Sequence, residues 1–313
     1  MAAVTVVGGG VVGLTSALLL ARAGHEVRCV RDVPSPGTVS AVAGGLWFPY
    51  HVEPRDRVVG WGLTSLRHFT MLAADPGAGV ALREGLLVER AGPDRWWTEG
   101  LTGWRDATPD ELPEGAPSGV VARVPLVAMV VYLDWLERAC VAAGVELVDG
   151  RVEDLGDQPG DVVVLAAGLR APALLPGLEV SPSRGQVALL ANPGLHRWLV
   201  DDGAPGGMTY VLPHRGWVVC GGSDAAGDRD EPDPQEHEQI VERCRRAVPA
   251  LRDAEVLGAR VGLRPVAPAV DLRVHDVGGR PVVTNVGHGG AGVTLSWGCA
   301  EEVTGLVGDL VRG

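Results

Sequence analysis

The feature that most constrains the fold lies near the N-terminus, where a short apolar run leads into a glycine-rich turn. Residues 4–7 read VTVV, and the segment Gly8–Gly13 reads GGGVVG. A helix is predicted from about Val11 to Ala23, then a strand over Glu26–Val30, with Asp32 just beyond it. Strand, glycine turn, helix, strand and acid in this order are typical of a βαβ unit that binds a dinucleotide. The sequence therefore predicts a nucleotide-binding domain of the Rossmann type.

The residue types in this unit suit a pyrophosphate group. Glycines allow the tight turn and the close approach of the phosphates, and the helix N-terminus supplies N–H donors and partial positive charge. An acid about 20 residues after the turn usually accepts a ribose hydroxyl, and Asp32 has that place. We expect this unit to contact the cofactor through the following residues: Gly8, Gly10, Val11, Val12, Gly13 and Asp32.

A second glycine-rich turn lies near the C-terminus, at Gly287–Gly292, after the extended run Pro281–Val286. A backbone with so little Cβ cover can approach a flat ligand closely, and the N–H groups of the helix that follows can face a negative ligand edge. By itself the segment is equally typical of a glycine-rich start to a buried helix. Together, the two turns favour a flavin over a nicotinamide, since a nicotinamide enzyme needs only the first.

Composition excludes several classes of protein. The chain has 313 residues, 46% of them hydrophobic, so one large or two interleaved units with a sizeable core are expected. Its net charge of −12 argues against a nucleic-acid partner. The five cysteines are scattered and never spaced as CxxC, so no metal site and no structural disulfide are expected. We find no secretory n-region and no apolar stretch long enough to span a membrane, and we expect a cytoplasmic protein.

Beyond the first unit, strands and helices no longer alternate simply. Helices are predicted over Arg55–Ala74, Val127–Ala143 and Pro232–Val248, and a strand over Ala81–Ala91. The remaining predicted strands fall into two groups: Val145–Val148 and Asp161–Ala166 in the nucleotide-binding sheet, and Arg184–Leu190, Met208–Leu212 and Trp217–Gly221 as antiparallel strands of a second sheet.

Several motifs together resemble those of the FAD-dependent D-amino acid oxidases. The segment Val6–Leu14 paired with Ala43–Tyr50 is similar to the start of that family, and Tyr210–Pro213, Gly262–Val266 and Gly287–Ala300 follow in the family's order. The resemblance spans nearly the whole chain and favours a bacterial member. It implies non-covalent FAD and oxidation of a D-amino acid to an imino acid, which yields a 2-oxo acid and ammonia. Oxygen would return the reduced flavin to its oxidised state and release hydrogen peroxide.

The resemblance also implies the fold class and the domains. We expect an α/β protein in which a Rossmann-like FAD-binding domain is interleaved with an α+β substrate-binding domain built on a mostly antiparallel sheet. The FAD-binding domain is expected to comprise residues 1–45, 127–180 and 259–313. The substrate-binding domain is expected to comprise residues 46–126 and 181–258.

Four residues are expected to contact the substrate by this resemblance. Arg264 is similar to the arginine that binds the substrate carboxylate, for which a planar guanidinium is well suited. Tyr210 is similar to the tyrosine that adds a second bond to that carboxylate, and the carbonyl of Gly290 would accept the amine. Phe48 replaces a glutamine common in the family and makes the pocket more apolar. No catalytic acid or base is required for hydride transfer, and His288 is interpreted as a structural or flavin-side residue.

The cofactor is expected to contact a further set of residues. Arg264 and Gly290 belong to this set as well as to the substrate contacts. The others are Ser40, Gly44, Gly45, Leu46, Trp47, Val152, Gly168, Gly287, Gly289, Gly292, Val293 and Thr294. The position of a bulky lid tyrosine found in mammalian members is Gly206 here, so the lid is expected to be missing.

Alternatives remain open at this point. A D-aspartate oxidase needs extra basic residues, whereas Asp224 places an acid where a base would help, so neutral side chains are favoured and basic ones remain an option. A glycine or sarcosine oxidase shares the first motif. A nicotinamide-dependent dehydrogenase and a non-catalytic flavin-binding protein are alternatives from other classes. The expected partners are a small D-amino acid and oxygen, without nucleic acid or membrane, and a homodimer is one option for the assembly.

Overall fold

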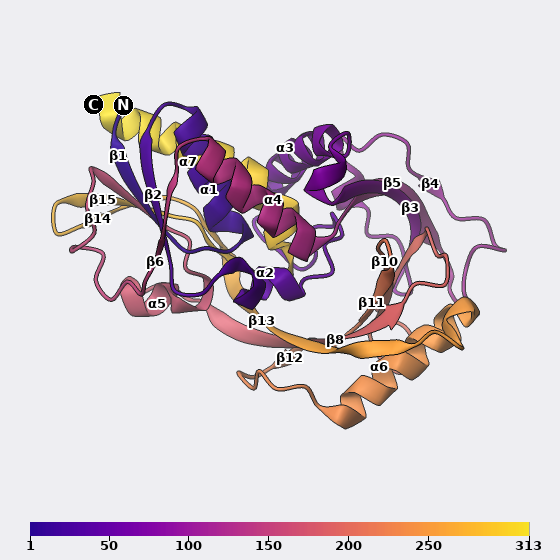
Figure 1. Ribbon diagram of the computed structural model, residues 1–313. Coiled ribbons are helices and arrows are strands. Elements are labelled where there is room, and N and C mark those ends of the chain that lie inside the picture. Colours follow the sequence, from indigo (N-terminus) through magenta and orange to yellow (C-terminus); the bar gives the residue numbers. More distant parts are fainter. Residues whose placement is uncertain (313) are drawn as a thin grey trace.

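Two sheets dominate the computed structural model, which describes residues 1–312 (Figure 1). The first has six strands, of which all but β14 run parallel to their neighbours. Its strand order is β14 (Val274–Val277), β15 (Arg280–Thr284), β7 (Val162–Leu165), β1 (Ala3–Val7), β2 (Glu26–Arg31) and β6 (Glu146–Asp149). Parallel strands are buried on both faces, so they read as continuous apolar runs, as the VVVL of β7 does.

Helices cover one face of this sheet. α1 (Val11–Arg22) packs between α4 (Met129–Ala142) and α7 (Gly292–Arg312), as Figure 1 shows. The other face carries a smaller core that includes Val7, Leu165 and Leu174 of the short helix α5 (Ala171–Leu174). The sheet is thus enclosed on both sides, in the doubly covered arrangement of nucleotide-binding folds.

The second sheet has ten strands and is mostly antiparallel; β3 and β9 pair in parallel. Its order is β16 (Val286–His288), β13 (Val256–Asp271), β8 (Ser181–Ala191), β11 (Trp217–Gly221), β10 (Thr209–Pro213), β9 (Trp198–Asp201), β3 (Val80–Val88), β5 (Gly119–Val127) and β4 (Arg105–Asp106), with β12 (Ala225–Ala226) on β8. The long strands β8 and β13 run from the first sheet's region into the second (Figure 1).

The remaining helices pack around this sheet. α6 (Pro234–Ala247) covers β8, β10 and β11 from outside, and the carboxylate of Asp233 caps its N-terminus. α3 (Arg55–Leu72) lies against α7. The short helix α2 (Val39–Val42) contacts β13. Single 3₁₀ turns occur at Ser35–Gly37, Pro76–Ala78, Trp96–Thr98, Gly168–Arg170, Pro249–Leu251 and Gly289–Ala291.

The mixed α/β fold and the mostly antiparallel second sheet confirm the predicted fold class. The elements differ from the prediction in two places. Val127 ends β5 instead of starting a helix, and β13 pairs within the second sheet although residues 259–271 were assigned to the FAD-binding domain. Pro265 and Pro268 argue against a strand at β13 in the sequence. Proline cannot donate a backbone hydrogen bond to a neighbouring strand and is unusual inside a strand. The division into two domains remains our proposal, with β8 and β13 extending between them.

Candidate functional site

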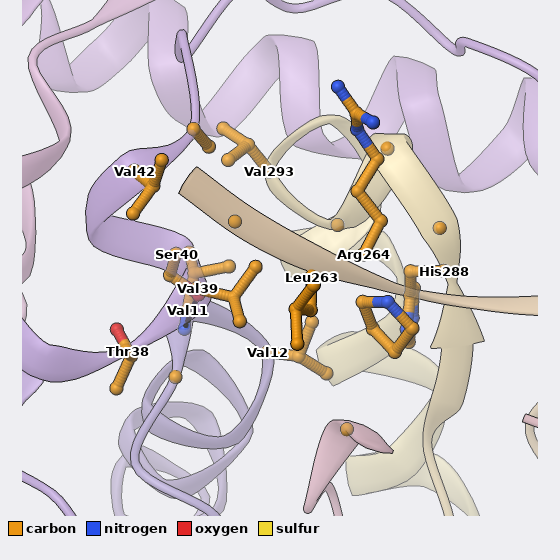
Figure 2. A pocket seen from close by; sticks show the side chains of 18 of the residues that line it. Val11, Val12, Thr38, Val39, Ser40, Val42, Leu263, Arg264, His288 and Val293 are labelled. Carbon is orange, nitrogen blue, oxygen red and sulfur yellow. Dashed lines mark hydrogen bonds between the residues drawn. The ribbon is translucent and has the colours of Figure 1, made fainter. Parts of the chain in front are cut away.

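A cavity of about 430 Å³ lies beyond the carboxyl ends of β1, β2 and β7, where the first sheet meets β8 and β13. Ligands of open parallel sheets bind at this edge. Figure 2 shows Thr38, Ser40 and Val11 together on one side of the cavity and Arg264 on the other, with Leu263 between them and His288 below Arg264. The cavity therefore offers an extended ligand two chemically different ends.

The β1–α1 turn at one end contains glycines at positions where the surrounding backbone leaves no room for a side chain. Gly8 has φ +130°, and a Cβ there would lie 2.3 Å from the carbonyl oxygen of Ala166. A Cβ on Gly13 would lie 2.0 Å from the carbonyl oxygen of Gly8, and Gly13 does not line the cavity. Gly13 thus lets α1 approach the turn closely, and its predicted contact with the cofactor stays a prediction.

Two polar contacts complete this end. The N–H of Val11 donates to Oγ of Ser40 over 3.0 Å, which ties the start of α1 to α2. Asp32 lines the cavity beyond β2, and Nη1 of Arg170 lies 3.2 Å from its carboxylate. Arg170 also donates to the carbonyl oxygen of Val152. The prediction missed Arg170, although it follows the predicted turn at Gly168 by two residues.

The middle of the cavity lies between the Gly44–Leu46 segment and the Gly287–Val293 turn, both of which line it. Nε2 of His214 is 3.1 Å from the carbonyl oxygen of Gly44. Burial lowers the pKa of His214 to about 4, so its ring is neutral at pH 7. A neutral imidazole can hold the Gly44 carbonyl by donating its N–H.

Trp47 and Thr294, which are predicted to contact the cofactor, are not among the residues that line the cavity. The Trp47 side chain is buried against α3 and donates its indole N–H to the carbonyl oxygen of Gly62 over 2.9 Å. The Thr294 hydroxyl donates to the carbonyl oxygen of Phe48 over 2.9 Å and accepts the Phe48 N–H over 3.0 Å. Both hydroxyl contacts are used within the protein, so the side chain of Thr294 positions Phe48.

Arg264 and Tyr210 meet at the other end of the cavity. The guanidinium of Arg264 lies over Gly185 of β8, and its Nη1 is buried without a hydrogen-bond partner. The ring of Tyr210 lies over Gly221, where a Cβ would be 2.0 Å from its Cζ. Burial raises the pKa of the Tyr210 phenol, with the Arg264 charge acting in the opposite direction. The hydroxyl is therefore a proton donor at neutral pH, next to a guanidinium with an unused donor.

Gly290 and Phe48 also line this end, together with Tyr50, which the prediction did not include. A Cβ on Gly290 would lie 3.0 Å from Cδ1 of Tyr50. Phe48 packs edge-on against Trp97, with ring centroids 5.3 Å apart. Tyr50 is the last residue of the Ala43–Tyr50 motif. Only this position in the motif indicates from the sequence that Tyr50 belongs to the site.

His288 lines the cavity beside the second glycine turn and is almost fully buried. Burial lowers its pKa to about 4, and its Nε2 has no hydrogen-bond partner. A neutral imidazole of such low basicity is a weak acceptor for a proton at pH 7.

The cavity brings together the rest of the predicted site. These residues line it: Gly8, Gly10, Val11, Val12, Asp32, Ser40, Gly44, Gly45, Leu46, Phe48, Val152, Gly168, Tyr210, Arg264, Gly287, Gly289, Gly290, Gly292 and Val293. The turn glycines at both ends of this set leave backbone surface bare, which suits an extended cofactor with a pyrophosphate and a flat ring.

Over residues 1–312, no cluster of three or more His, Cys, Asp or Glu side chains is arranged to hold a metal ion. Nor, over the same residues, does any helix combine the length and the apolar character needed to cross a bilayer.

Comparisons with known proteins match this description over the whole chain. The FAD-dependent oxidoreductase family model, abbreviated DAO, matches residues 3–306. The chain is 43% identical to a D-amino-acid oxidase of Rubrobacter xylanophilus, covering 98% of this chain and 96% of the relative. It is 44% identical to a D-amino-acid oxidase of Streptomyces coelicolor, with 97% and 96% covered.

More distant similarities point to the same fold. A D-aspartate oxidase of Homo sapiens is 32% identical over 99% of this chain and 96% of its own length. Among solved structures, a glycine oxidase of Bacillus cereus superimposes with a TM-score of 0.81 at 19% identity, covering 99% of this chain and 95% of that protein. At that identity the likeness concerns the fold alone.

Proposed function

The chain belongs to the FAD-dependent oxidoreductase family, and we propose that it acts as a D-amino-acid oxidase. The overall reaction converts a D-amino acid, water and oxygen into a 2-oxo acid, ammonia and hydrogen peroxide. The observation that carries the proposal is the pairing of Arg264, whose Nη1 has no hydrogen-bond partner, with the protonated hydroxyl of Tyr210 at one end of the cavity. Such a pair is suited to bind a carboxylate.

The two glycine turns would hold FAD. The Gly8–Val12 turn and the N-terminus of α1 would face the pyrophosphate, and Asp32 would face the ribose. The Gly44–Leu46 segment and the Gly287–Val293 turn would enclose the ring. The bound FAD would supply the hydride-accepting chemistry of the reaction, with oxygen as the final electron acceptor.

The protein's part in the reaction is orientation. Arg264 and Tyr210 would fix the substrate carboxylate, and the carbonyl of Gly290 would accept a hydrogen bond from the amine. Two anchored groups, with the side chain confined to the remaining space, leave one enantiomer with its Cα hydrogen toward the ring. This arrangement supports selectivity for one enantiomer, and the relatives named D-amino-acid oxidases favour the D form.

No side chain is proposed as a catalytic acid or base. His288 is a neutral imidazole with a pKa of about 4, and Tyr210 has a raised pKa and stays protonated. Neither matches the near-neutral pKa that suits general acid–base catalysis. The substrate would react with its amine neutral and its carboxylate ionised.

We further propose that D-amino acids with neutral side chains are better substrates than D-aspartate. The apolar residues that line the cavity include Phe48, Val200, Met208 and Leu212. Asp224 lies 3.7 Å from Nη1 of Arg264, and its charge would repel a second carboxylate. Comparable kcat/KM values for D-aspartate and D-leucine would contradict this preference and favour the D-aspartate oxidase alternative.

Anaerobic mixing of the purified protein with D-alanine or D-leucine, and then with the L forms, tests the function. We expect loss of the oxidised flavin absorbance with the D forms only. Absence of bleaching by every amino acid would favour a non-catalytic flavin protein, and a colourless protein reduced by a nicotinamide would favour a dehydrogenase. Preference for glycine or sarcosine over both alanine enantiomers would favour that oxidase class.

We propose a cytoplasmic location for this activity. All five cysteines of the described residues are free and buried, as is usual in a reducing compartment. Fractionation of the source cells, with the activity followed against markers of each compartment, tests this. Analytical ultracentrifugation of the purified protein distinguishes a monomer from a homodimer.

A further inference from the structure

Two carboxylates that the reaction described above does not use lie at the substrate end of the site: Asp202 lines the cavity, and Asp224 contacts the lining residues Arg264 and Tyr50. Asp202 lines the cavity just after β9. Asp224 follows β11, and the hydroxyl of Tyr50 lies 3.3 Å from its Oδ2. Ser183 also donates a hydrogen bond to Asp224. After burial, the charges of Asp202 and Asp224 are the next largest causes that raise the pKa of Tyr50, so both acids lie close to one phenol.

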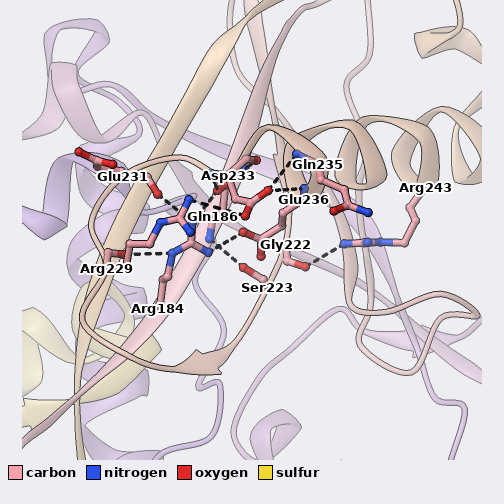
Figure 3. Close-up of polar contacts among 10 residues, drawn as sticks. All are labelled: Arg184, Gln186, Gly222, Ser223, Arg229, Glu231, Asp233, Gln235, Glu236 and Arg243. Carbon is pink, nitrogen blue, oxygen red and sulfur yellow. Dashed lines mark hydrogen bonds and ion pairs between the residues drawn. The ribbon is translucent and has the colours of Figure 1, made fainter.

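The loop that carries Asp224 is held firmly against β8 (Figure 3). The N–H of Gln186 donates to Oγ of Ser223 over 2.9 Å, and the Gln186 side chain exchanges hydrogen bonds of 2.7 and 2.8 Å with the backbone of Asp233. Arg184 binds Gln186 and Glu236 and the carbonyl oxygens of Arg229 and Glu231. Gln186 is fully buried. Asp224 is therefore placed before any substrate arrives.

The loop that carries Asp202 is joined to the same framework. Nη2 of Arg243 donates to the carbonyl oxygen of Met208 over 3.3 Å and to that of Gly222 over 3.0 Å, the second of which is drawn in Figure 3. Met208 and Asp202 bound one short loop between β9 and β10. Arg243 thus links the loops that carry Asp202 and Asp224 through their carbonyl groups. In the described part of the chain it forms no ion pair with either carboxylate.

The charges at this end are unbalanced once a substrate binds. Arg264 is the cation that lines the cavity here, and the substrate's own carboxylate would pair with it. Nη1 of Arg264 is 3.7 Å from Asp224, and Nε2 of the exposed His51 is 3.5 Å from Asp202. With Arg264 engaged by the substrate, Asp202 in the cavity wall and Asp224 beside Tyr50 and Arg264 leave a net negative charge around the remaining space. A positive group that enters this space gains attraction from both.

The wall between Arg264 and these acids suits a chain of methylenes. Val200 and Met208 are apolar and line the cavity beside Asp202. We propose that Asp202 and Asp224 determine side-chain charge specificity, so that D-amino acids whose long side chain ends in a cation are preferred over neutral ones of the same length. This inference rests on the proposed function and extends it. Short neutral side chains contact only the apolar wall, and acidic side chains are repelled.

The test compares substrates that differ in one charged group. D-lysine and D-norleucine share the same methylene chain, and D-ornithine and D-norvaline form a second pair. The measured quantity is the ratio of kcat/KM for the cationic substrate to that for its neutral counterpart. A variant that disturbs Arg264 or the flavin affects both substrates of a pair equally. Such an effect cancels in the ratio. We expect a ratio of about ten or more for the unmodified enzyme at low salt, falling toward one as salt screens the charges.

Variants identify the residues responsible. Asp224→Asn and Asp202→Asn are each expected to lower the ratio about three- to ten-fold, and Asp224→Lys to lower it below one while improving the relative rate with D-glutamate. Asp228→Asn, an exposed acid on the same loop, serves as the matched control and should leave the ratio unchanged. Flavin content and melting temperature verify that each variant is folded.

The outcomes separate the two proposals. A ratio of one or less in the unmodified enzyme, with D-norleucine oxidised normally, overturns the charge specificity and leaves the oxidase function intact. A ratio that stays the same in both asparagine variants also overturns it. Failure of D-norleucine and D-lysine alike to reduce the flavin overturns the oxidase function itself.

Discussion

Arg264 takes its position from a neighbour that has no side chain. A Cβ on Gly185 would lie 2.3 Å from Nη2 and 2.4 Å from Cζ of Arg264. Contacts under 3.0 Å are not tolerated, and the flexible guanidinium is the group that can move. The glycine in β8 therefore determines where a carboxylate can bind.

Gly185→Ala is accordingly expected to raise the KM for D-alanine about ten-fold or more while FAD stays bound. Steady-state kinetics and the flavin-to-protein absorbance ratio measure both effects. Gly60→Ala is the control, because Gly60 lies in α3 with open space around its Cα, and helical alanine is favoured over glycine by about 1 kcal/mol. An unchanged KM in the Gly185 variant would mean that the guanidinium position does not matter for binding.

Removal of the guanidinium itself should have a larger effect. Arg264→Ala deletes a charge-assisted contact worth about 1.5–3 kcal/mol, so kcat/KM should fall about 10- to 150-fold, mainly through KM. FAD should remain bound. Arg215→Ala, at an exposed position after β10, is the control. If the Arg264 variant instead loses its flavin, the residue has a structural role.

Single residues also mark the limit of what the sequence can predict. The motifs located the segments correctly, so most of the predicted residues line the cavity. They do not determine which way each side chain points. Trp47 and Thr294 point into the protein, because an indole N–H and a hydroxyl find backbone partners there. Asp202 enters the site through a loop whose position depends on distant strands, and nothing in its local sequence signals this.

At the scale of elements, the β1–α1 unit depends on close packing between helix and turn. A Cβ on Gly13 would lie 2.0 Å from a backbone oxygen, which cannot move as a flexible side chain can. Gly13→Ala should therefore shift α1 and displace the turn that faces the cofactor.

We expect this variant to melt several degrees lower and to bind FAD at least ten-fold more weakly, as measured by thermal unfolding and by titration of the apoprotein with FAD. Gly305→Ala, an exposed glycine in α7 with open space, is the matched helical control and should be neutral or slightly stabilising. Normal FAD affinity in the Gly13 variant would show that the turn tolerates a displaced helix.

The elements that were predicted best are those whose signal is local. β1, α1 and β2 are recognisable because apolar periodicity, a glycine turn and a C-terminal glycine all occur within 30 residues of sequence. β13 is a 16-residue strand that contains two prolines and pairs with β8, from which it is distant in sequence. Its pairing depends on tertiary contacts, and the local pattern gives no reason to expect a strand.

At the scale of the whole molecule, two buried imidazoles make stability depend on pH. Burial lowers the pKa of His214 and of His288 to about 4, from 6.5 for an unperturbed histidine. Between these values the unfolded chain binds protons that the folded chain does not. The free energy of unfolding should therefore fall as pH is lowered from about 6.5 towards 4, by up to roughly 3 kcal/mol for each histidine.

Urea unfolding of the holoenzyme at pH 7.5, 6.5, 5.5 and 5 checks this expectation. His214→Gln and His288→Asn should each reduce the dependence on pH, whereas the exposed His196→Gln should not. The stabilisation that the lowered pKa values of Glu89 and Asp233 provide is lost as pH falls below their unperturbed values of 4.5 and 3.8, which lie below the lowest pH of this series. A flat profile between pH 6.5 and 5 would contradict the assignment.

The walls of the cavity are contributed by segments that are scattered from Val7 to Val293. A chain synthesised from its N-terminus completes the β1–α1 turn early, yet β13 and the Gly287–Val293 turn emerge only near the end. A nascent chain thus displays the pyrophosphate turn without the surface against which the ring would lie. We therefore expect loading with FAD to be a late step in the biosynthesis of this protein.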